Sequence, residues 1–338
     1  MNKDERIEFS KILYGISLPD GIADAEISIR YNPLIDYMKK FLPLRLYRFR
    51  SCEERNFDAL YKNQIWASNG ECMNDGFDAR MFYDKSEVEE EIQKSLSDDK
   101  LERFITILKS GIFPNVDNDV LKERLQKYRD EVLNKVQNGL GSLFTLVQKS
   151  TKFACFSEDI CSSAMWGLYS NNESGFAIEY VFNSNNWNRQ YDNGVIETFS
   201  LYPTVYNDKR FKVPNDYIQF LIKRNIFANQ INPQILNALA PCPDKSMVTK
   251  ISLRKSMEWE YEKEWRIIFT RNDYQFFNNK YSSFIAEPSA LYLGRRISFI
   301  HEMFLKEIAK EKKIPVFKMQ LNDASPTYRV YPKICVNL

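Results

Sequence analysis

Strand-like segments lie on both sides of a long helical stretch, and this arrangement is what most limits the fold. Residues 86–150 repeat apolar positions such as Val88, Ile92 and Leu121 at helical spacing among dense charges, which predicts a helical insertion. The flanking strand-like segments are 44–50, 64–68, 152–157, 175–182 and 265–269. Because they do not alternate regularly with helices, a doubly wound parallel sheet is not expected. We predict an α+β fold in which helices pack on a mixed, mostly antiparallel sheet.

The domain organisation follows from the same change of pattern. Residues 1–43 are expected to form a helical lead-in, interrupted at 19–21 and at Pro33. The core then comprises 44–85 and 151–338, with the insertion at 86–150 between its two parts. No apolar run reaches the roughly 18 residues that span a bilayer, so we expect a cytoplasmic protein with no membrane partner.

An acidic comb precedes the last of these predicted strands. Between residues 256 and 270, four glutamates alternate with aromatic or basic side chains: Glu258, Glu260, Glu262 and Glu264. In an extended chain these carboxylates share one face, while Trp259, Tyr261 and Trp265 supply burial on the other. Such an acidic face is often only solvated. However, the segment leads directly into the apolar run 265–269, which is expected to form a buried strand. The last carboxylates then lie at the edge of the core, where a rigid strand can orient them toward a cleft.

The shortage of histidines and of closely spaced cysteines argues against several types of metal site and catalytic site. The chain has one histidine, His301, and its six cysteines include no C-x-x-C pair. A zinc site of the usual Cys/His type and a Ser-His-Asp or Cys-His catalytic unit are therefore not expected, and we predict no resident metal. No glycine-rich phosphate loop occurs, and 47 basic residues nearly balance 45 acidic ones. Carboxylates, arginines and hydroxyls must carry any chemistry.

Five blocks follow one another along the chain: 46–50, 65–68 with 74–78, 155–158, 165–179 and 255–266. Taken in this order, they resemble a bacterial family of unknown function, DUF2971. The resemblance covers roughly residues 44 to 335. This chain departs from the family in having Gly76 where the loop usually has proline, and in the length of its helical insertion. The family name carries no activity.

The blocks contain an arginine on an early strand (Arg50 or Arg48), a serine at a mid-chain strand end (Ser157) and a Glu-x-Glu pair that enters a late strand (Glu262 with Glu264). This order is similar to the R-S-E scheme of the ADP-ribosyltransferase superfamily. The resemblance implies NAD as substrate and a sheet of ADP-ribosyltransferase-like type. A guanidinium then grips phosphate or ribose, and Glu264 stabilises the cationic sugar left when nicotinamide departs, while Glu262 places the acceptor.

Further contacts to NAD are expected from the second strand, the loop after it and a mid-chain helix. These residues are Ser68, Asn74, Asp75, Trp166 and Tyr169. The two rings fit a base-stacking pocket or simple packing under the sheet.

The expected function is NAD-dependent ADP-ribosyl transfer by a bacterial toxin or phage-defence effector. Its partners would be a macromolecular acceptor, either a nucleic acid (RNA or DNA) or a protein, and a neutralising antitoxin protein. One alternative is a metal-dependent nuclease, because Asp75, Asp78, Glu179 and the acidic comb offer carboxylates to one or two Mg²⁺ ions. Another is a non-enzymatic interaction module, in which the rings only pack and the charged insertion contacts a partner.

Overall fold

The chain has the α+β architecture that its sequence predicts. The computed structural model describes every residue except 96, 98–101, 104, 107, 108, 111–113, 128, 185, 191, 193, 195, 228–233, 235, 236, 238, 239, 272–278, 337 and 338. Parts of the predicted insertion at 86–150 thus lie outside the described residues. No helix in the described parts of the chain has both the length and the apolar character needed to cross a bilayer.

Most strands belong to one sheet. They are β1 (Leu46–Arg50), β2 (Gln64–Asn69), β4 (Lys152–Ser157), β5 (Phe176–Tyr180), β6 (Asn186–Gln190), β7 (Ile196–Pro203), β11 (Glu264–Arg271), β12 (Tyr281–Ile285), β13 (Ala290–Leu293), β14 (Val316–Leu321) and β15 (Val330–Val336). The order is β15-β14-β13-β5-β1-β4-β11-β7-β6, and β2 pairs with β4 and β12. These pairings are antiparallel except that of β13 with β14, which confirms the mixed, mostly antiparallel sheet.

Strand β4 has two different partners along one edge. Near its C-terminal end Ser157 lies opposite Tyr47 of β1, whereas near its N-terminal end Phe153 lies opposite Ser68 of β2. The other edge of β4 pairs along its whole length with β11. Strands β1 and β2 thus pair with different parts of the same edge of β4 and separate from each other beyond it. The sheet forks at this point.

Seven further elements complete the core around this sheet. They are α3 (Glu54–Tyr61), η1 (Gly70–Cys72), α8 (Ser163–Tyr169), β8 (Val205–Asn207), β10 (Arg254–Ser256), η2 (Met257–Glu262) and α13 (Phe299–Lys312). Strands β8 and β10 form a separate parallel pair. Ser298 caps α13, because its side chain accepts a hydrogen bond from the backbone N–H of His301.

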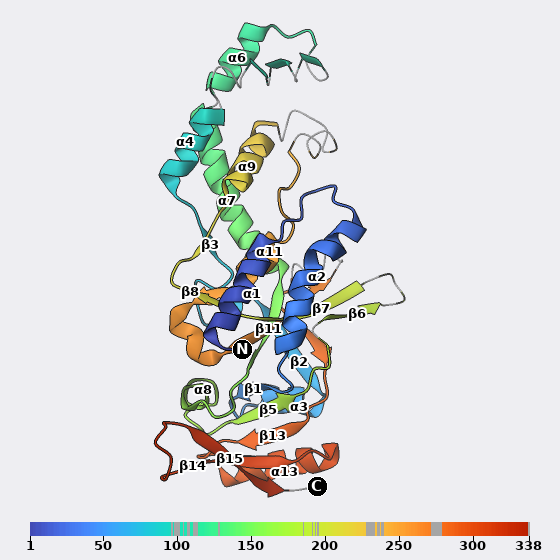
Figure 1. Ribbon diagram of the computed structural model, residues 1–338, viewed down its shortest axis with the longest axis vertical. Helices are drawn as coiled ribbons and strands as arrows, with labels where there is room; N and C mark the ends of the chain where they lie inside the picture. The colour runs from blue at the N-terminus through green and yellow to red at the C-terminus, as the bar shows by residue number, and fades with distance from the viewer. Residues whose placement is uncertain are drawn as a thin grey trace.

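The lead-in forms two helices, α1 (Lys3–Gly15) and α2 (Asp24–Phe41), which lie side by side in front of the sheet in Figure 1. Pro33 lies inside α2, so the predicted interruption there is wrong. Proline removes one backbone hydrogen bond, but Leu34 and Met38 are buried and keep this part of the helix against the core.

Helices from two parts of the chain gather at the upper end of the molecule in Figure 1. They are α4 (Lys85–Ser95), α6 (Asn118–Lys127), α7 (Arg129–Ser150), α9 (Asn215–Phe227) and, nearer the sheet, α11 (Met247–Ser252). Val88 and Val136 of the predicted insertion share one buried cluster with Ile218 and Ile251. Parallel pairing of β3 (Met81–Phe82) with β9 (Phe211–Lys212) joins the two parts. We call α4, α6, α7, α9 and α11 together the helical lobe. Its helices α9 and α11 lie in the part of the chain that the predicted boundaries assign to the core.

The acidic comb is not extended, contrary to the prediction. Residues 257–262 form the 3₁₀ helix η2, and Lys263 has a left-handed φ of 45° before β11 begins at Glu264. Two local effects oppose a strand here. Four carboxylates on one face repel each other, and the Ser256 hydroxyl accepts a hydrogen bond from the backbone N–H of Glu258 at 3.4 Å, which favours a helical start. The predicted strand at 265–269 is confirmed within β11.

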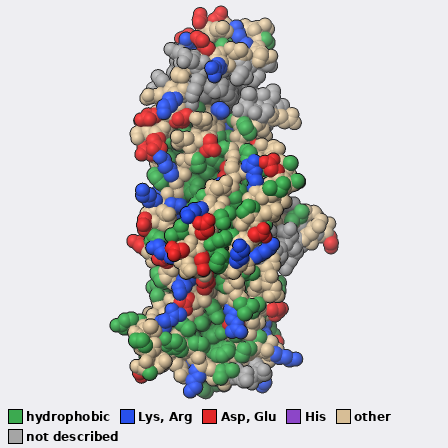
Figure 2. All heavy atoms as spheres, viewed as in Figure 1, with side chains coloured by type: hydrophobic (Ala, Val, Ile, Leu, Met, Phe, Trp, Pro, Cys, Tyr) green, Lys and Arg blue, Asp and Glu red, His purple; other side chains and the backbone are tan. Residues whose placement is uncertain are grey.

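The face of the molecule shown in Figure 2 has no large patch of a single charge. Figure 2 shows acidic and basic side chains mixed along most of this face, and hydrophobic side chains gathered over its lower part. This mixture agrees with the formal net charge of +2. On this face, any recognition of a charged ligand must therefore come from local sites.

Candidate active site

A cavity of about 620 Å³ opens where β1 and β2 diverge from β4. Side chains from β1, β2, β4, α8, β10 and the junction of η2 with β11 line it. It brings together most of the residues predicted from the sequence: Arg48, Arg50, Ser68, Asn74, Ser157, Tyr169, Glu262 and Glu264. The fork in the sheet is the reason, because it gathers strand ends that are far apart in the sequence.

Two arginines in this cavity lack a negative partner. An Arg48 Nη atom donates to the carbonyl of Trp66 at 2.9 Å, and an Arg50 Nη atom donates to the carbonyl of Phe49 at 2.8 Å. Arg48 Nε is buried without a hydrogen-bond partner. Burial, together with the charge of Arg50, lowers the pKa of Arg48 to about 9, so it stays protonated at neutral pH. In the described chain no carboxylate pairs with either guanidinium, and the cavity therefore favours an anion.

Glu264 is held as an anion by two cations. Arg266 donates to its two oxygens at 3.0 and 3.1 Å, and Lys255 Nζ lies 3.2 Å from Oε2. Its backbone N–H donates to the Tyr206 hydroxyl at 2.7 Å. Burial alone raises the pKa of this carboxyl, but the charges of Arg266 and Lys255 outweigh it and hold the pKa well below its usual range.

The pKa of Glu262 is shifted in the opposite direction from that of Glu264. Its Oε2 accepts from Lys255 Nζ at 2.6 Å, and its Oε1 accepts from the Tyr169 hydroxyl. Burial and the neighbouring charge of Glu264 raise the pKa of Glu262. The two carboxylates share Lys255, yet their environments push their pKa values apart, as is typical of acid-base pairs with different tasks.

Arg266 ties this site to the loop after β2. Its Nη atoms donate to the two oxygens of Asp78 at 2.6 and 2.7 Å, and one of them also donates to the carbonyl of Ser252 at 2.6 Å. The side chains of Arg266 and Asp78 are both fully buried. Arg266 and Lys255 were not predicted from the sequence as site residues. For Arg266 a signal exists, because a guanidinium inside the apolar run 265–269 needs a buried partner.

Ser157 stabilises the turn that presents Glu262 and Glu264. Its hydroxyl donates to the carbonyl of Glu262 at 2.7 Å and accepts from the backbone N–H of Asp159 at 3.1 Å. Ser157 also lies opposite Glu264 in the sheet. It lines the cavity, but its hydrogen bonds go to the backbone.

Two of the predicted NAD contacts do not line the cavity. Trp166 is fully buried, its Nε1 donates to the carbonyl of Ile160 at 2.7 Å, and its ring packs on Phe49 at 5.1 Å. Asp75 closes a turn by accepting from the backbone N–H of Phe77 at 2.9 Å. Trp166 therefore packs in the core, and Asp75 shapes the loop that carries Asn74.

Trp66 is a cavity residue that was not predicted from the sequence. Its ring is 48% exposed and lines the cavity from β2. Ser283 lies opposite it on β12, and Tyr281, which is 55% exposed, lies opposite Ser68 two positions away on the same face. Exposed rings on a sheet are candidates for stacking on a base.

The carboxylates proposed for a nuclease do not converge. Asp78 is committed to Arg266, while Glu179 accepts hydrogen bonds from Ser289 at 2.9 Å and Tyr292 at 2.7 Å. Within the described residues, no group of three His, Cys, Asp or Glu side chains is arranged to hold a metal ion.

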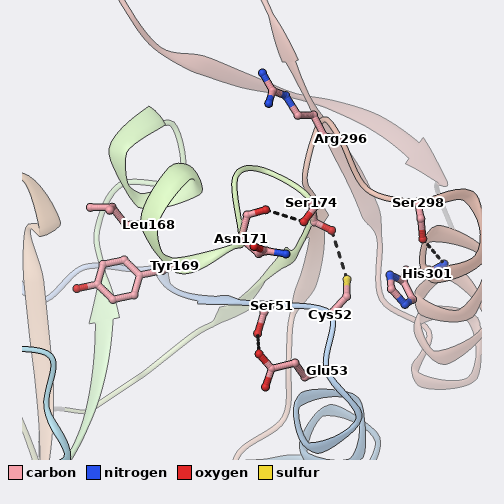
Figure 3. A pocket seen from close by; sticks show the side chains of 10 residues that line it. All are labelled: Ser51, Cys52, Glu53, Leu168, Tyr169, Asn171, Ser174, Arg296, Ser298 and His301. Atoms are coloured by element: carbon pink, nitrogen blue, oxygen red, sulfur yellow. Dashed lines mark hydrogen bonds between the residues drawn. The ribbon is translucent and has the colours of Figure 1, made fainter.

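A second polar pocket of about 630 Å³ adjoins the main cavity (Figure 3). Tyr169 and Ser51 line both spaces. Figure 3 shows Ser51 bonded to Glu53, and Ser174 bonded to Asn171 and Cys52. Since the Tyr169 hydroxyl donates to Glu262, this side chain forms part of the wall between the two spaces.

Comparisons with known proteins find a family match for part of this chain. Residues 165–267 match the model of a family described as protein of unknown function (DUF2971). The matched segment runs from α8 to β11, and so includes Tyr169, Lys255, Glu262 and Glu264 of the cavity. No curated protein and no solved structure matches the chain. The match over residues 165–267 supports the resemblance to DUF2971 that the sequence blocks indicate.

Proposed function

We propose that the cavity at the fork of the sheet binds NAD and that the protein is an ADP-ribosyltransferase. One observation carries this proposal: two buried or half-buried arginines without carboxylate partners face the same cavity as a pair of glutamates with divergent pKa values. Arg48 and Arg50 suit the pyrophosphate of a dinucleotide, and the exposed ring of Trp66 suits one of its bases. The resemblance to the R-S-E scheme supports the same choice of substrate.

The two glutamates suit the two halves of the reaction. When the bond between ribose C1′ and nicotinamide breaks, nicotinamide leaves with the electron pair and positive charge develops on the sugar. Glu264, kept ionised by Arg266 and Lys255, stabilises that charge. The acceptor then forms a bond to C1′ and loses a proton, which Glu262 accepts because its pKa is raised.

A nucleotide-binding module without catalysis is the second candidate. The engagement of both Glu264 oxygens by Arg266 and Lys255 favours it, because those contacts also suit a purely structural ion network. Both candidates require an anionic nucleotide in the cavity. They differ in whether nicotinamide is released.

The acceptor and the setting complete the proposal. We place the protein in the cytoplasm, where its six free cysteines fit a reducing environment. The acceptor is a macromolecule, nucleic acid or protein, as for toxins and phage-defence effectors of the superfamily that the sequence resembles.

Arg50→Lys is expected to weaken NAD binding about tenfold. Lysine keeps the charge but loses the planar fork that binds a phosphate through two parallel hydrogen bonds. Isothermal titration calorimetry measures the affinity, and thermal unfolding without ligand should barely change. Arg45→Lys is the matched control, because Arg45 is 55% exposed and faces Glu179 outside the cavity. Equal affinity in the Arg50 variant and the wild type would place the nucleotide elsewhere.

A further inference from the structure

A third cavity, of about 660 Å³, lies between the C-terminal end of α1 and strands β9 and β10. Five basic side chains line this basic groove: Lys209, Arg210, Lys212, Lys250 and Arg254. Glu87 neutralises Lys212 at 2.5 Å, and Asp244 neutralises Lys250 at 2.7 Å. In the described parts of the chain no carboxylate pairs with the other three cations, and Asp216 is the remaining acid in the wall. The groove therefore carries a net positive charge.

The guanidiniums of the groove are held in place before any ligand binds. Arg254 Nε donates to the carbonyl of Lys209 at 2.8 Å, and its Nη1 donates to the Tyr14 hydroxyl at 3.3 Å. Arg210 donates to the carbonyl of Met81 and lies 6.0 Å from the centre of the Phe82 ring. Side chains that are already ordered lose less conformational entropy on binding.

Aromatic rings alternate with these cations. Arg210 lies 5.0 Å from the centre of the Phe77 ring, which is 60% exposed. Arg254 lies 5.6 Å from the centre of the Tyr14 ring, which in turn contacts Phe211 at 5.7 Å. A small anion would use the charges alone. Single-stranded nucleic acid uses both, because phosphates meet the cations and bases stack on the rings.

We propose that the basic groove binds a segment of single-stranded nucleic acid, with phosphates at Lys209, Arg210 and Arg254 and a base against Phe77. This binding does not depend on ADP-ribosyl transfer. Arg254 and Lys255 are neighbours on β10, and successive side chains of a strand point to opposite sides, so Arg254 lines the groove while Lys255 lines the main cavity. If the proposed transferase activity also holds, the bound strand is its acceptor.

The binding is tested without NAD, by fluorescence anisotropy with fluorescein-labelled dodecamers of uridylate and thymidylate at 0.1 M salt. Arg210→Gln with Arg254→Gln should weaken binding about tenfold or more and reduce the slope of log K against log salt by about 1.4. The control removes two charges elsewhere, as Lys39→Gln with Lys62→Gln, whose side chains are 64% and 54% exposed, and should bind like the wild type. No binding by the wild type, equal losses in both double variants, or displacement of the dodecamer by an equal phosphate concentration of inorganic pyrophosphate would each overturn the proposal.

Photo-cross-linking of the wild type keeps the proposal testable if the arginine variant does not fold. A dodecamer that carries 5-iodouridine should cross-link to Phe77, Tyr14 or Phe211, as located by mass spectrometry of the digested protein. Cross-links confined to other parts of the chain would contradict the groove as the binding site.

Discussion

Arg266→Met is expected to lower the free energy of unfolding by about 3–5 kcal/mol, the largest loss of stability that we predict for a single side chain. The guanidinium is fully buried and pairs with Asp78 and Glu264, so its removal leaves both carboxylates without their main partner in the core. Urea unfolding followed by circular dichroism measures the change. Lys62→Met removes a half-exposed ion pair with Asp58 and should change the free energy by less than about 1 kcal/mol.

A second substitution separates charge from packing. Adding Asp78→Asn to Arg266→Met removes one of the two unpaired charges, so the double variant should be more stable than Arg266→Met alone. This stabilising role of Arg266 would be contradicted if the two substitutions lowered the free energy of unfolding additively, or if Arg266→Met alone lowered it by less than about 1 kcal/mol. Either result would show that the ion pairs of Arg266 do not hold the segment 70–80 against β11.

Glu264→Gln is expected to reduce ADP-ribosyl transfer by a hundredfold or more, which corresponds to about 3 kcal/mol of transition-state stabilisation. Glutamine keeps the shape of the side chain but removes the charge that Arg266 and Lys255 stabilise. Turnover is measured with NAD labelled in its adenylate moiety. Melting temperatures must be compared as well, because the same substitution alters a buried ion network.

Two further glutamates in the same turn sharpen this test. Glu258→Gln is the matched control, since Glu258 is exposed on η2 and does not line the cavity, and its rate should equal that of the wild type. Glu262→Gln should lose transfer but keep part of the NAD hydrolysis, because the role that we propose for Glu262 is to accept the proton of the acceptor. Near-normal transfer by a folded Glu264→Gln variant would contradict the catalytic assignment.

The strands of the core were predictable because their signals are local. Alternating and apolar runs at 46–50, 152–157 and 265–269 all form strands. The conformation at 257–262 was not predictable from alternation alone, because the serine cap and repulsion among the carboxylates decide it. Pro33 was misleading for a related reason: tertiary packing of Leu34 and Met38 outweighs one lost hydrogen bond.

The cavity itself depends on contacts that no short segment encodes. The R-S-E order selected Arg48, Arg50, Ser157, Glu262 and Glu264, all of which line it. Whether Trp166 or Trp66 faces the cavity, however, depends on how β1 and β2 diverge from β4, and sequence spacing does not carry that information. The same holds for Asp78 and Arg266, which are 188 positions apart.

The helical lobe limits how the predicted insertion can be tested. Val88 and Val136 share a buried cluster with Ile218 and Ile251, so deletion of 86–150 would expose apolar side chains of α9 and α11. A role for this lobe in binding an acceptor or an antitoxin is therefore better tested with substitutions of exposed charged residues than with a deletion.

The release of nicotinamide tests the central proposal most directly. The purified protein is incubated with NAD and with cell extract, and free nicotinamide is measured by chromatography while adenylate label is followed into macromolecules. We expect nicotinamide to appear in proportion to the transferred label, with nuclease or protease digestion identifying the acceptor, and we expect both signals to fall a hundredfold or more in Glu264→Gln. A folded wild-type protein that releases no nicotinamide, with or without extract, would contradict the assignment of this cavity to ADP-ribosyl transfer.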